Sequence, residues 1–213
     1  MNDIECGKQC CVTDTGALVN LCRLELGTKR AIEWVLEDFC VCVPQKIFDE
    51  GRVYLPYDDD EGRTIYFNAV QGQVRNLSAS CEEIIDRQVD SLPPKEKSKI
   101  DAGEKKAAAL TYEFSRIQKQ YVLFVTNDFK AIPPLDVVFA RTQTAFIKNA
   151  FDLLFFIASR HPDEIPLDEL GIAIRELNRM IRDPDKDGDT TSDQLLLDYL
   201  LAIQKYPGAF SAI

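Results

Sequence analysis

The chain has 213 residues, a formal net charge of −10 at pH 7, and 46% hydrophobic residues. This length fits one large domain, or one domain with a smaller appendage, and the apolar fraction is enough for a core. The negative balance argues against a protein that coats nucleic acid indiscriminately, although a nuclease is not excluded, because basic residues can be gathered locally. No apolar run approaches the length of about twenty residues that a membrane span needs, and the N-terminus lacks the segments of a signal peptide. A soluble, cytoplasmic protein is therefore expected.

The seven cysteines are an odd number, and without an export signal they are expected to be reduced thiols. Cys6, Cys10 and Cys11 cluster, but the chain has a single histidine and no second pair of cysteines at ligand spacing, which argues against zinc. Cys40 and Cys42 alternate with valines, as small core residues on one face of a strand do.

Strand and helix alternate through the first half of the chain, which predicts an α/β fold with a parallel sheet. Strands are expected at 9–14 and 39–43, and helices at 17–26, 29–37 and 45–53. The acidic, turn-like segment 54–68 is expected to be a surface insertion, and a metal site at Asp58–Glu61 is its alternative.

The second half begins with a predicted helix over 71–90 and a linker rich in proline and lysine at 92–99. A helix follows from Asp101, then the clearest strand of the sequence at 120–126, and a last strand is expected at 135–140. From Thr142 the chain is expected to be helical to its end, with breaks at 161–162 and 182–189, and 145–158 is expected to be a buried helix.

Five carboxylates fall where such a fold brings side chains together. Asp14 ends the first strand, Glu50 lies on the helix after the second, Asp101 and Glu104 open a helix, and Asp128 follows the strand 120–126. Sites in open parallel sheets form at the carboxyl ends of the strands, near a switch in strand order. The five acids are therefore expected to converge at one edge.

Each acid also has an ordinary structural explanation. An Asp followed three residues later by a Glu, ahead of a helical run, is a capping box. Asp14 could cap the helix after it, Glu50 could be a solvated helix residue, and Asp128 could cap the turn that follows. The placement of all of them at expected edge positions favours a shared site.

Four motifs occur in the order and approximate spacing of PIN domains, and the chain resembles that family over about residues 9 to 160. The motifs are Val12–Leu18, Pro44–Glu50, Asp101–Leu110 and Phe124–Asp128. The resemblance implies a three-layer α/β/α domain at 9–160, with an insertion at 54–70 and a linker at 91–99, followed by a helical extension at 161–213.

The resemblance also implies a function. PIN-like proteins are metal-dependent nucleases that mostly act on RNA, and many are toxins of toxin–antitoxin pairs. By this resemblance Asp14, Glu50, Glu104 and Asp128 are catalytic metal-site acids, with Asp101 as a further ligand and Thr15, Thr126 and Asn127 in support. RNA is the implied substrate, and an antitoxin, another protein or a second copy of the chain are the implied protein partners.

The chemistry of the residues agrees with this expectation. Packed carboxylates repel one another unless a divalent cation neutralises them, and hard oxygen ligands favour Mg²⁺ or Mn²⁺. Such ions activate water for attack on phosphorus. No Ser–His or Cys–His nucleophile is indicated, since the only histidine, His161, precedes a proline.

Four cations are candidates for holding an RNA backbone, with Arg141 the best placed after the expected last strand. They are Lys105, Lys106, Lys130 and Arg141, and solvated surface charge is the alternative for each.

The tail holds a further motif. Asp183, Asp185, Asp187 and Asp189 resemble the start of an EF-hand calcium loop, but Gln194 stands where the bidentate Glu belongs. A polar turn between two helices is the alternative, and any calcium affinity should be weak. Two other functions stay open beside the nuclease: a non-catalytic PIN-like module that binds a protein, and a calcium-responsive interaction protein.

Overall fold

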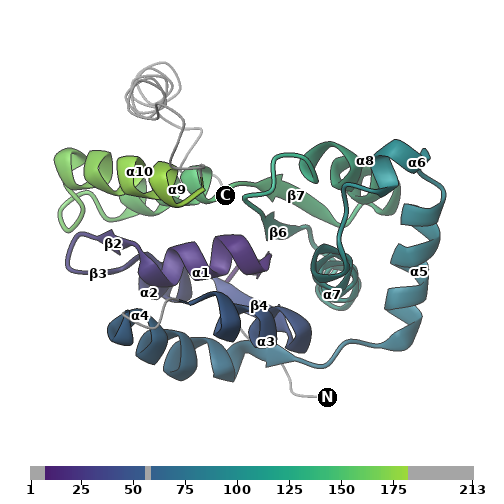
Figure 1. Cartoon of the computed structure of the whole chain (residues 1–213), viewed down its shortest axis with the longest axis horizontal. Coiled ribbons are helices and arrows are strands. Elements are labelled where there is room, and N and C mark those ends of the chain that lie inside the picture. Colours follow the sequence, from purple (N-terminus) through teal and green to yellow (C-terminus); the bar gives the residue numbers. More distant parts are fainter. Residues whose placement is uncertain (1–7, 56–58, 182–213) are drawn as a thin grey trace.

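The computed structural model describes residues 8–55 and 59–181, and its centre is a parallel five-stranded sheet in the order β5-β4-β1-β6-β7 (Figure 1). The strands of this sheet are β1 (Cys10–Thr13), β4 (Cys40–Pro44), β5 (Val74–Arg75), β6 (Val122–Val125) and β7 (Ala145–Lys148). A separate antiparallel hairpin joins β2 (Glu25–Leu26) to β3 (Lys29–Arg30). The expected α/β class with a parallel sheet is confirmed.

Helices flank the sheet (Figure 1). They are α1 (Thr15–Arg23), α2 (Ala31–Asp38), α3 (Gln45–Tyr54), α4 (Asp60–Ile65), α5 (Ala79–Asp90), α6 (Pro94–Lys97), α7 (Ala102–Gln118), α8 (Ile132–Thr142), α9 (Ala150–Arg160) and α10 (Leu167–Ile181). A π-helical turn (Tyr66–Val70) and a 3₁₀ turn (Gln71–Gln73) lead into β5. None of the helices in the described ranges is long and apolar enough to cross a membrane.

The register of the sheet places β1 at its centre. Val12 pairs with Cys42 of β4 on one side and with Phe124 of β6 on the other, and all three side chains are fully buried. Residues buried on both faces in this way are typical of a parallel strand covered by helices. Helix α7 supplies part of that cover by packing across β1, β4 and β6.

The strand order reverses beside β1. From β1 the chain builds β4 and β5 on one side, and then crosses to β6 and β7 on the other. This is a topological switch point, outside which open α/β sheets form their ligand sites.

The expected last strand at 135–140 is wrong, because these residues lie inside α8. Leu135, Val138 and Phe139 are buried while Val137 is exposed, a spacing of three and four that belongs to a helix. Pro133 and Pro134 fall in the first turn, where a missing N–H costs no internal hydrogen bond.

The expected buried helix at 145–158 is wrong at its start, and so is the continuous helix from Thr142. Residues Ala145–Lys148 form β7, the edge strand paired with β6, and α9 begins only after Asn149. The Asn149 side chain caps α9 by accepting from Asp152 N at 2.9 Å, so the helix starts at a polar residue within the apolar stretch.

The helix expected over 71–90 is shorter, since α5 begins at Ala79 after β5. The linker contains the short helix α6, with Leu92 and Ile100 buried at its two ends.

The segment 54–68 is an insertion only in part, because Tyr66 is fully buried and donates to the carbonyl of Phe48 at 2.7 Å.

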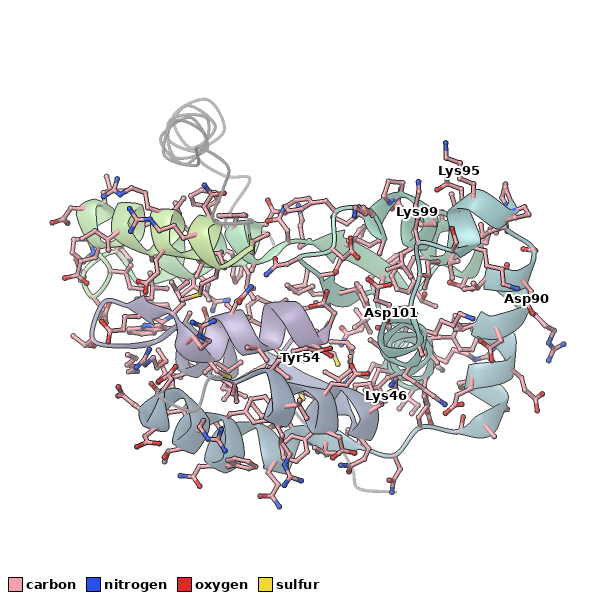
Figure 2. All side chains as sticks on the ribbon, in the orientation of Figure 1. Lys46, Tyr54, Asp90, Lys95, Lys99 and Asp101 are labelled. Atoms are coloured by element: carbon pink, nitrogen blue, oxygen red, sulfur yellow. The ribbon has the colours of Figure 1, made fainter. Side chains whose placement is uncertain are left out.

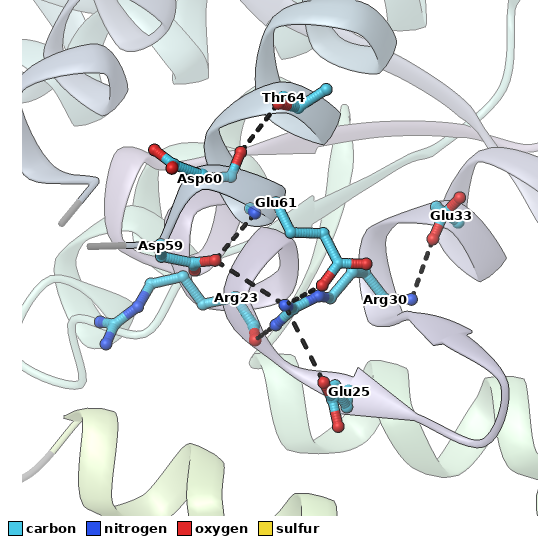
Figure 3. A network of polar contacts seen from close by, with 9 residues as sticks. Arg23, Glu25, Arg30, Glu33, Asp59, Asp60, Glu61 and Thr64 are labelled. Atoms are coloured by element: carbon cyan, nitrogen blue, oxygen red, sulfur yellow. Dashed lines mark hydrogen bonds and ion pairs between the residues drawn. The ribbon is translucent and has the colours of Figure 1, made fainter. Parts of the chain in front are cut away.

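The acidic residues of this segment are engaged by protein groups (Figure 3). Asp59 accepts from Gly62 N at 2.8 Å and caps α4, and Arg30 pairs with Glu61 at 2.8 Å and with Asp59 at 3.7 Å. Asp58 lies outside the described residues, as do Cys6 and the calcium-loop residues Asp183 to Asp189. The helix expected before that loop is confirmed as α10.

Candidate functional site

An open cavity of about 560 Å³ lies at the carboxyl ends of β1 and β6, at the switch point. All five carboxylates predicted to converge line it, together with Thr15 and Asn127. The remaining lining residues are Gly16, Val19, Asn20, Arg23, Ile47, Tyr54, Gly103, Met180 and Ile181. In Figure 2 Asp101, the N-cap residue of α7, lies near Tyr54 and Lys46 of α3.

Asp14 forms the floor of the cavity and is 6% exposed. It caps α1 by accepting from Ala17 N at 2.6 Å, and its second oxygen accepts from the Thr126 hydroxyl and from Asn127 N at 3.2 Å. Burial raises the pKa of Asp14 to about 6, although these hydrogen bonds oppose the rise. The expectation that Asp14 caps the helix is therefore met by the same side chain that lines the cavity.

Asp101 and Glu104 form a complete capping box at the start of α7. Asp101 accepts from Glu104 N and Glu104 accepts from Asp101 N, each at 2.8 Å. Burial raises the pKa of Glu104 to about 8, and the negative charges of Asp101, Asp128 and Asp14 add to the rise. The cap leaves Oδ2 of Asp101 and Oε1 of Glu104 without a donor from the described residues.

Glu50 reaches the cavity from α3, and both of its carboxylate oxygens have a protein partner. Its two oxygens accept from the Thr15 hydroxyl at 2.8 Å and pair with Lys46 at 2.6 Å. Burial alone would raise the pKa of Glu50, but these two hydrogen bonds outweigh it and the pKa is lowered. Thr15, predicted to support the site, does so by positioning this carboxylate.

Asp128 and Asn127 follow β6. Asp128 accepts from Lys130 N at 2.8 Å, and its own N–H donates to the Thr126 hydroxyl at 3.0 Å. The Thr126 hydroxyl thus joins the backbone of one acid to the side chain of another, Asp14. Asn127 holds α9 in place by accepting from Ala150 N at 3.1 Å, while its buried Nδ2 has no partner among the described groups.

The donor set fits a hard divalent cation in its chemistry. Five carboxylates around one cavity supply only oxygen ligands. Burial is the main cause of the raised pKa values of Asp14 and Glu104, and neighbouring carboxylates add to both. As the side chains stand in residues 8–55 and 59–181, however, no three His, Cys, Asp or Glu are in position to hold one ion. Ligation of an ion by three of these acids therefore requires a change of side-chain rotamer.

The predicted RNA-binding cations do not line the cavity. Lys105 pairs with Asp86 at 3.7 Å, Lys106 pairs with Glu82, and Arg141 donates to Ser91 Oγ at 2.7 Å. Lys130 lies beside Asp128 in sequence, and its backbone N–H caps that side chain.

Three residues of the cavity with polar side chains were missed in the sequence: Asn20, Arg23 and Tyr54. The signal for the first two was helical spacing, since Asn20 and Arg23 lie four and seven residues after Gly16 and share one face of α1 with it. Tyr54 lies four residues after Glu50 on α3 and shares its face.

The expected packing role of Cys40 and Cys42 agrees with the structure, in which both side chains are buried and neither forms a disulfide. Comparisons with protein-family models, with curated proteins and with solved structures give no match.

Proposed function

We propose that this chain is a divalent-metal-dependent endoribonuclease, with the five cavity carboxylates as its metal-binding and catalytic groups. The observation that carries the proposal is the convergence of Asp14, Glu50, Asp101, Glu104 and Asp128 on one cavity at the switch point of a parallel sheet. The order of the PIN-like motifs along the chain supports RNA as the substrate.

The arrangement gives each acid a distinct task. Asp14 is rigid, because three donors hold it, and it would be the fixed ligand around which others adjust. Glu104 and Asp128 each keep one oxygen without a donor from the described residues and can turn toward an ion. A bound Mg²⁺ or Mn²⁺ would supply charge neutralisation and an activated water at the phosphate.

Thr126 and the capping box serve as positioning groups. The Thr126 hydroxyl orients Asp14, and the box holds Glu104 against the first turn of α7. The positive end of that helix also favours negative charge at this place.

The test is a titration of Mn²⁺ into wild type, Asp14→Asn and Asp128→Asn, following the melting temperature and the cleavage of a mixed RNA pool. Binding of the ion to the folded state should raise the melting temperature of wild type, and both effects should be lost in the two variants. Asp90→Asn is the control, because Asp90 is an exposed acid of α5 that pairs with Lys97 and lies away from the cavity (Figure 2). Cleavage by Asp14→Asn at the wild-type rate would refute the proposal.

A second candidate is a non-catalytic PIN-like module that binds a protein. The observation favouring it is that no three acids of the described ranges stand ready to hold an ion. A melting shift without cleavage of any RNA, or no shift at all, would favour this module. A toxin role with an antitoxin partner belongs to the nuclease proposal and is tested by growth arrest on expression of wild type but not of Asp14→Asn.

A further inference from the structure

The cavity extends along one face of α1, away from the acids. Gly16, Asn20 and Arg23 line it at successive turns, and α10 contributes Met180 and Ile181. From Thr15 to Arg23, at a rise of 1.5 Å per residue, this face is about 12 Å long. That length matches about three stacked nucleotides at 3.4 Å each. The groove is therefore longer than the reacting phosphate alone requires.

Arg23 lies at the far end of this groove, and its guanidinium has no ion-pair partner among the described residues. Its carbonyl accepts from the Arg30 guanidinium, but its own guanidinium makes no hydrogen bond or ion pair with the described residues. Figure 3 shows the Arg23 side chain extending away from the network in which Arg30 is held by Glu25, Asp59 and Glu61. A cation that lines an acidic cavity without pairing is available to a phosphate, which guanidinium groups bind in a bidentate manner.

Two further side chains suit the rest of a nucleotide. Tyr54 is 68% exposed at the cavity, and aromatic rings exposed in this way are stacking platforms for bases in single strands. Asn20 is 9% exposed and lines the groove, yet its amide has no hydrogen-bond partner in the described part of the chain. An amide that lines a groove and has no partner among the described residues is available to hydrogen-bond a ligand there.

We propose that Arg23, Asn20 and Tyr54 form a subsite for the nucleotides that flank the reacting phosphate. Arg23 binds a phosphate on one side of the cleaved bond, Asn20 donates or accepts a hydrogen bond at a base or sugar, and Tyr54 stacks on a base. Stacking on Tyr54 requires an unpaired base, so the subsite selects single strands over duplexes. This inference rests on the proposed function for the position of the reacting phosphate, but the subsite can be measured without cleavage.

The experiment measures binding of a fluorescent 12-nucleotide RNA by anisotropy, with Ca²⁺ as the divalent cation and a gel check that the RNA stays intact. Single-stranded and duplex RNA and single-stranded DNA of one sequence are compared over a range of salt concentrations. The variants are Arg23→Gln, Arg23→Lys, Tyr54→Ala and Tyr54→Phe. Lys95→Gln, an exposed charge on α6 (Figure 2), and Phe146→Ala, an aromatic side chain that is 60% exposed on β7, are the matched controls.

Arg23→Gln should lower the magnitude of the slope of log K against log salt by about 0.7, the value for one phosphate of a single strand. Arg23→Lys should keep that slope. Tyr54→Ala should weaken binding by about fivefold or more, while Tyr54→Phe keeps it. Single strands should bind at least tenfold more tightly than the duplex.

Three results would overturn the subsite: wild type that binds no single strand, a duplex that binds equally well, or Arg23 and Tyr54 variants that match the two controls. If wild type cleaves RNA while these variants match the controls, the nuclease stands and the subsite fails. If the variants weaken binding as expected while Mn²⁺ supports no cleavage, the subsite stands and the nuclease fails.

Discussion

The carboxylates of the cavity should make the metal-free protein less stable as the pH rises. Asp14 titrates at about 6 in the folded chain and near 3.8 when unfolded, so the folded state binds its proton more tightly. A carboxyl group shifted in this direction stabilises the fold at acid pH, and that contribution is lost as the pH rises through the folded pKa. The whole difference corresponds to about 3 kcal/mol, of which about 1.4 kcal/mol falls between pH 5 and 8. Glu104, whose pKa is raised to about 8, acts in the same direction across the same window.

The measurement is urea unfolding followed by circular dichroism, in EDTA, at intervals from pH 5 to 8, for wild type and Asp14→Asn. Groups other than the cavity acids titrate alike in both proteins, so the difference between the two pH profiles isolates Asp14. The free energy of unfolding of wild type should fall more steeply than that of the variant, by about 1.4 kcal/mol or more over the window. Mn²⁺ at pH 8 should restore the loss in wild type only.

Two results would refute this reasoning. A wild-type stability that is constant or rises between pH 5 and 8 would mean that the acids are not held in a desolvated cluster. Equal slopes in wild type and Asp14→Asn would mean that Asp14 is not the group responsible. Either result would also remove the electrostatic support for a cation at this cavity.

The remaining predictions concern the groups that hold the site together. Thr126→Val keeps the shape of the side chain but removes the donor to Asp14, and should cost about 1–3 kcal/mol at pH 8 and less at pH 5, measured by urea unfolding. Gly51→Ala places a Cβ 2.1 Å from the buried Tyr66 hydroxyl and should cost about 1–3 kcal/mol by overpacking, visible as a lower melting temperature. Gly72→Ala, where a Cβ meets nothing within 4 Å, is its control and should leave the melting temperature nearly unchanged.

The sequence predicted the strands that are runs of mostly apolar residues buried along their whole length. Cys10–Thr13, Cys40–Pro44 and Val122–Val125 have this pattern, and all are buried on both faces. The edge strands lack it. β5 has two residues and β7 is exposed at Phe146, so neither contains enough local signal to be separated from its surroundings. The valines of 135–140 favoured a strand in the sequence. The structure has a helix there, which buries Leu135, Val138 and Phe139 at a spacing of three and four residues.

The acids of the cavity were predictable because strand ends and helix starts are marked in the sequence. Their hydrogen bonds were predictable only where they are local, as in the capping box of Asp101 and Glu104. The contacts of Thr15 with Glu50 and of Thr126 with Asp14 join residues far apart in the chain and depend on the packing of three elements. Arg23 was missed for the same reason, because only the fold shows that α1 lies along the cavity with its last residue at the far end.

The net negative charge of the chain is compatible with the proposed function. Most of the acids lie outside the groove, and the acids inside the groove would be neutralised by a bound cation. Some cations elsewhere on the chain are paired with acids, as Lys105 is with Asp86 and Lys97 with Asp90. A phosphate approaching the metal-free cavity would meet five carboxylates and one free guanidinium, and would be repelled. If the proposed function holds, affinity for RNA would depend on a divalent cation at the acids, with Arg23 binding a flanking phosphate. Such a protein would bind nucleic acid only when its metal site is filled. Its net charge of −10 would oppose non-specific binding at other times.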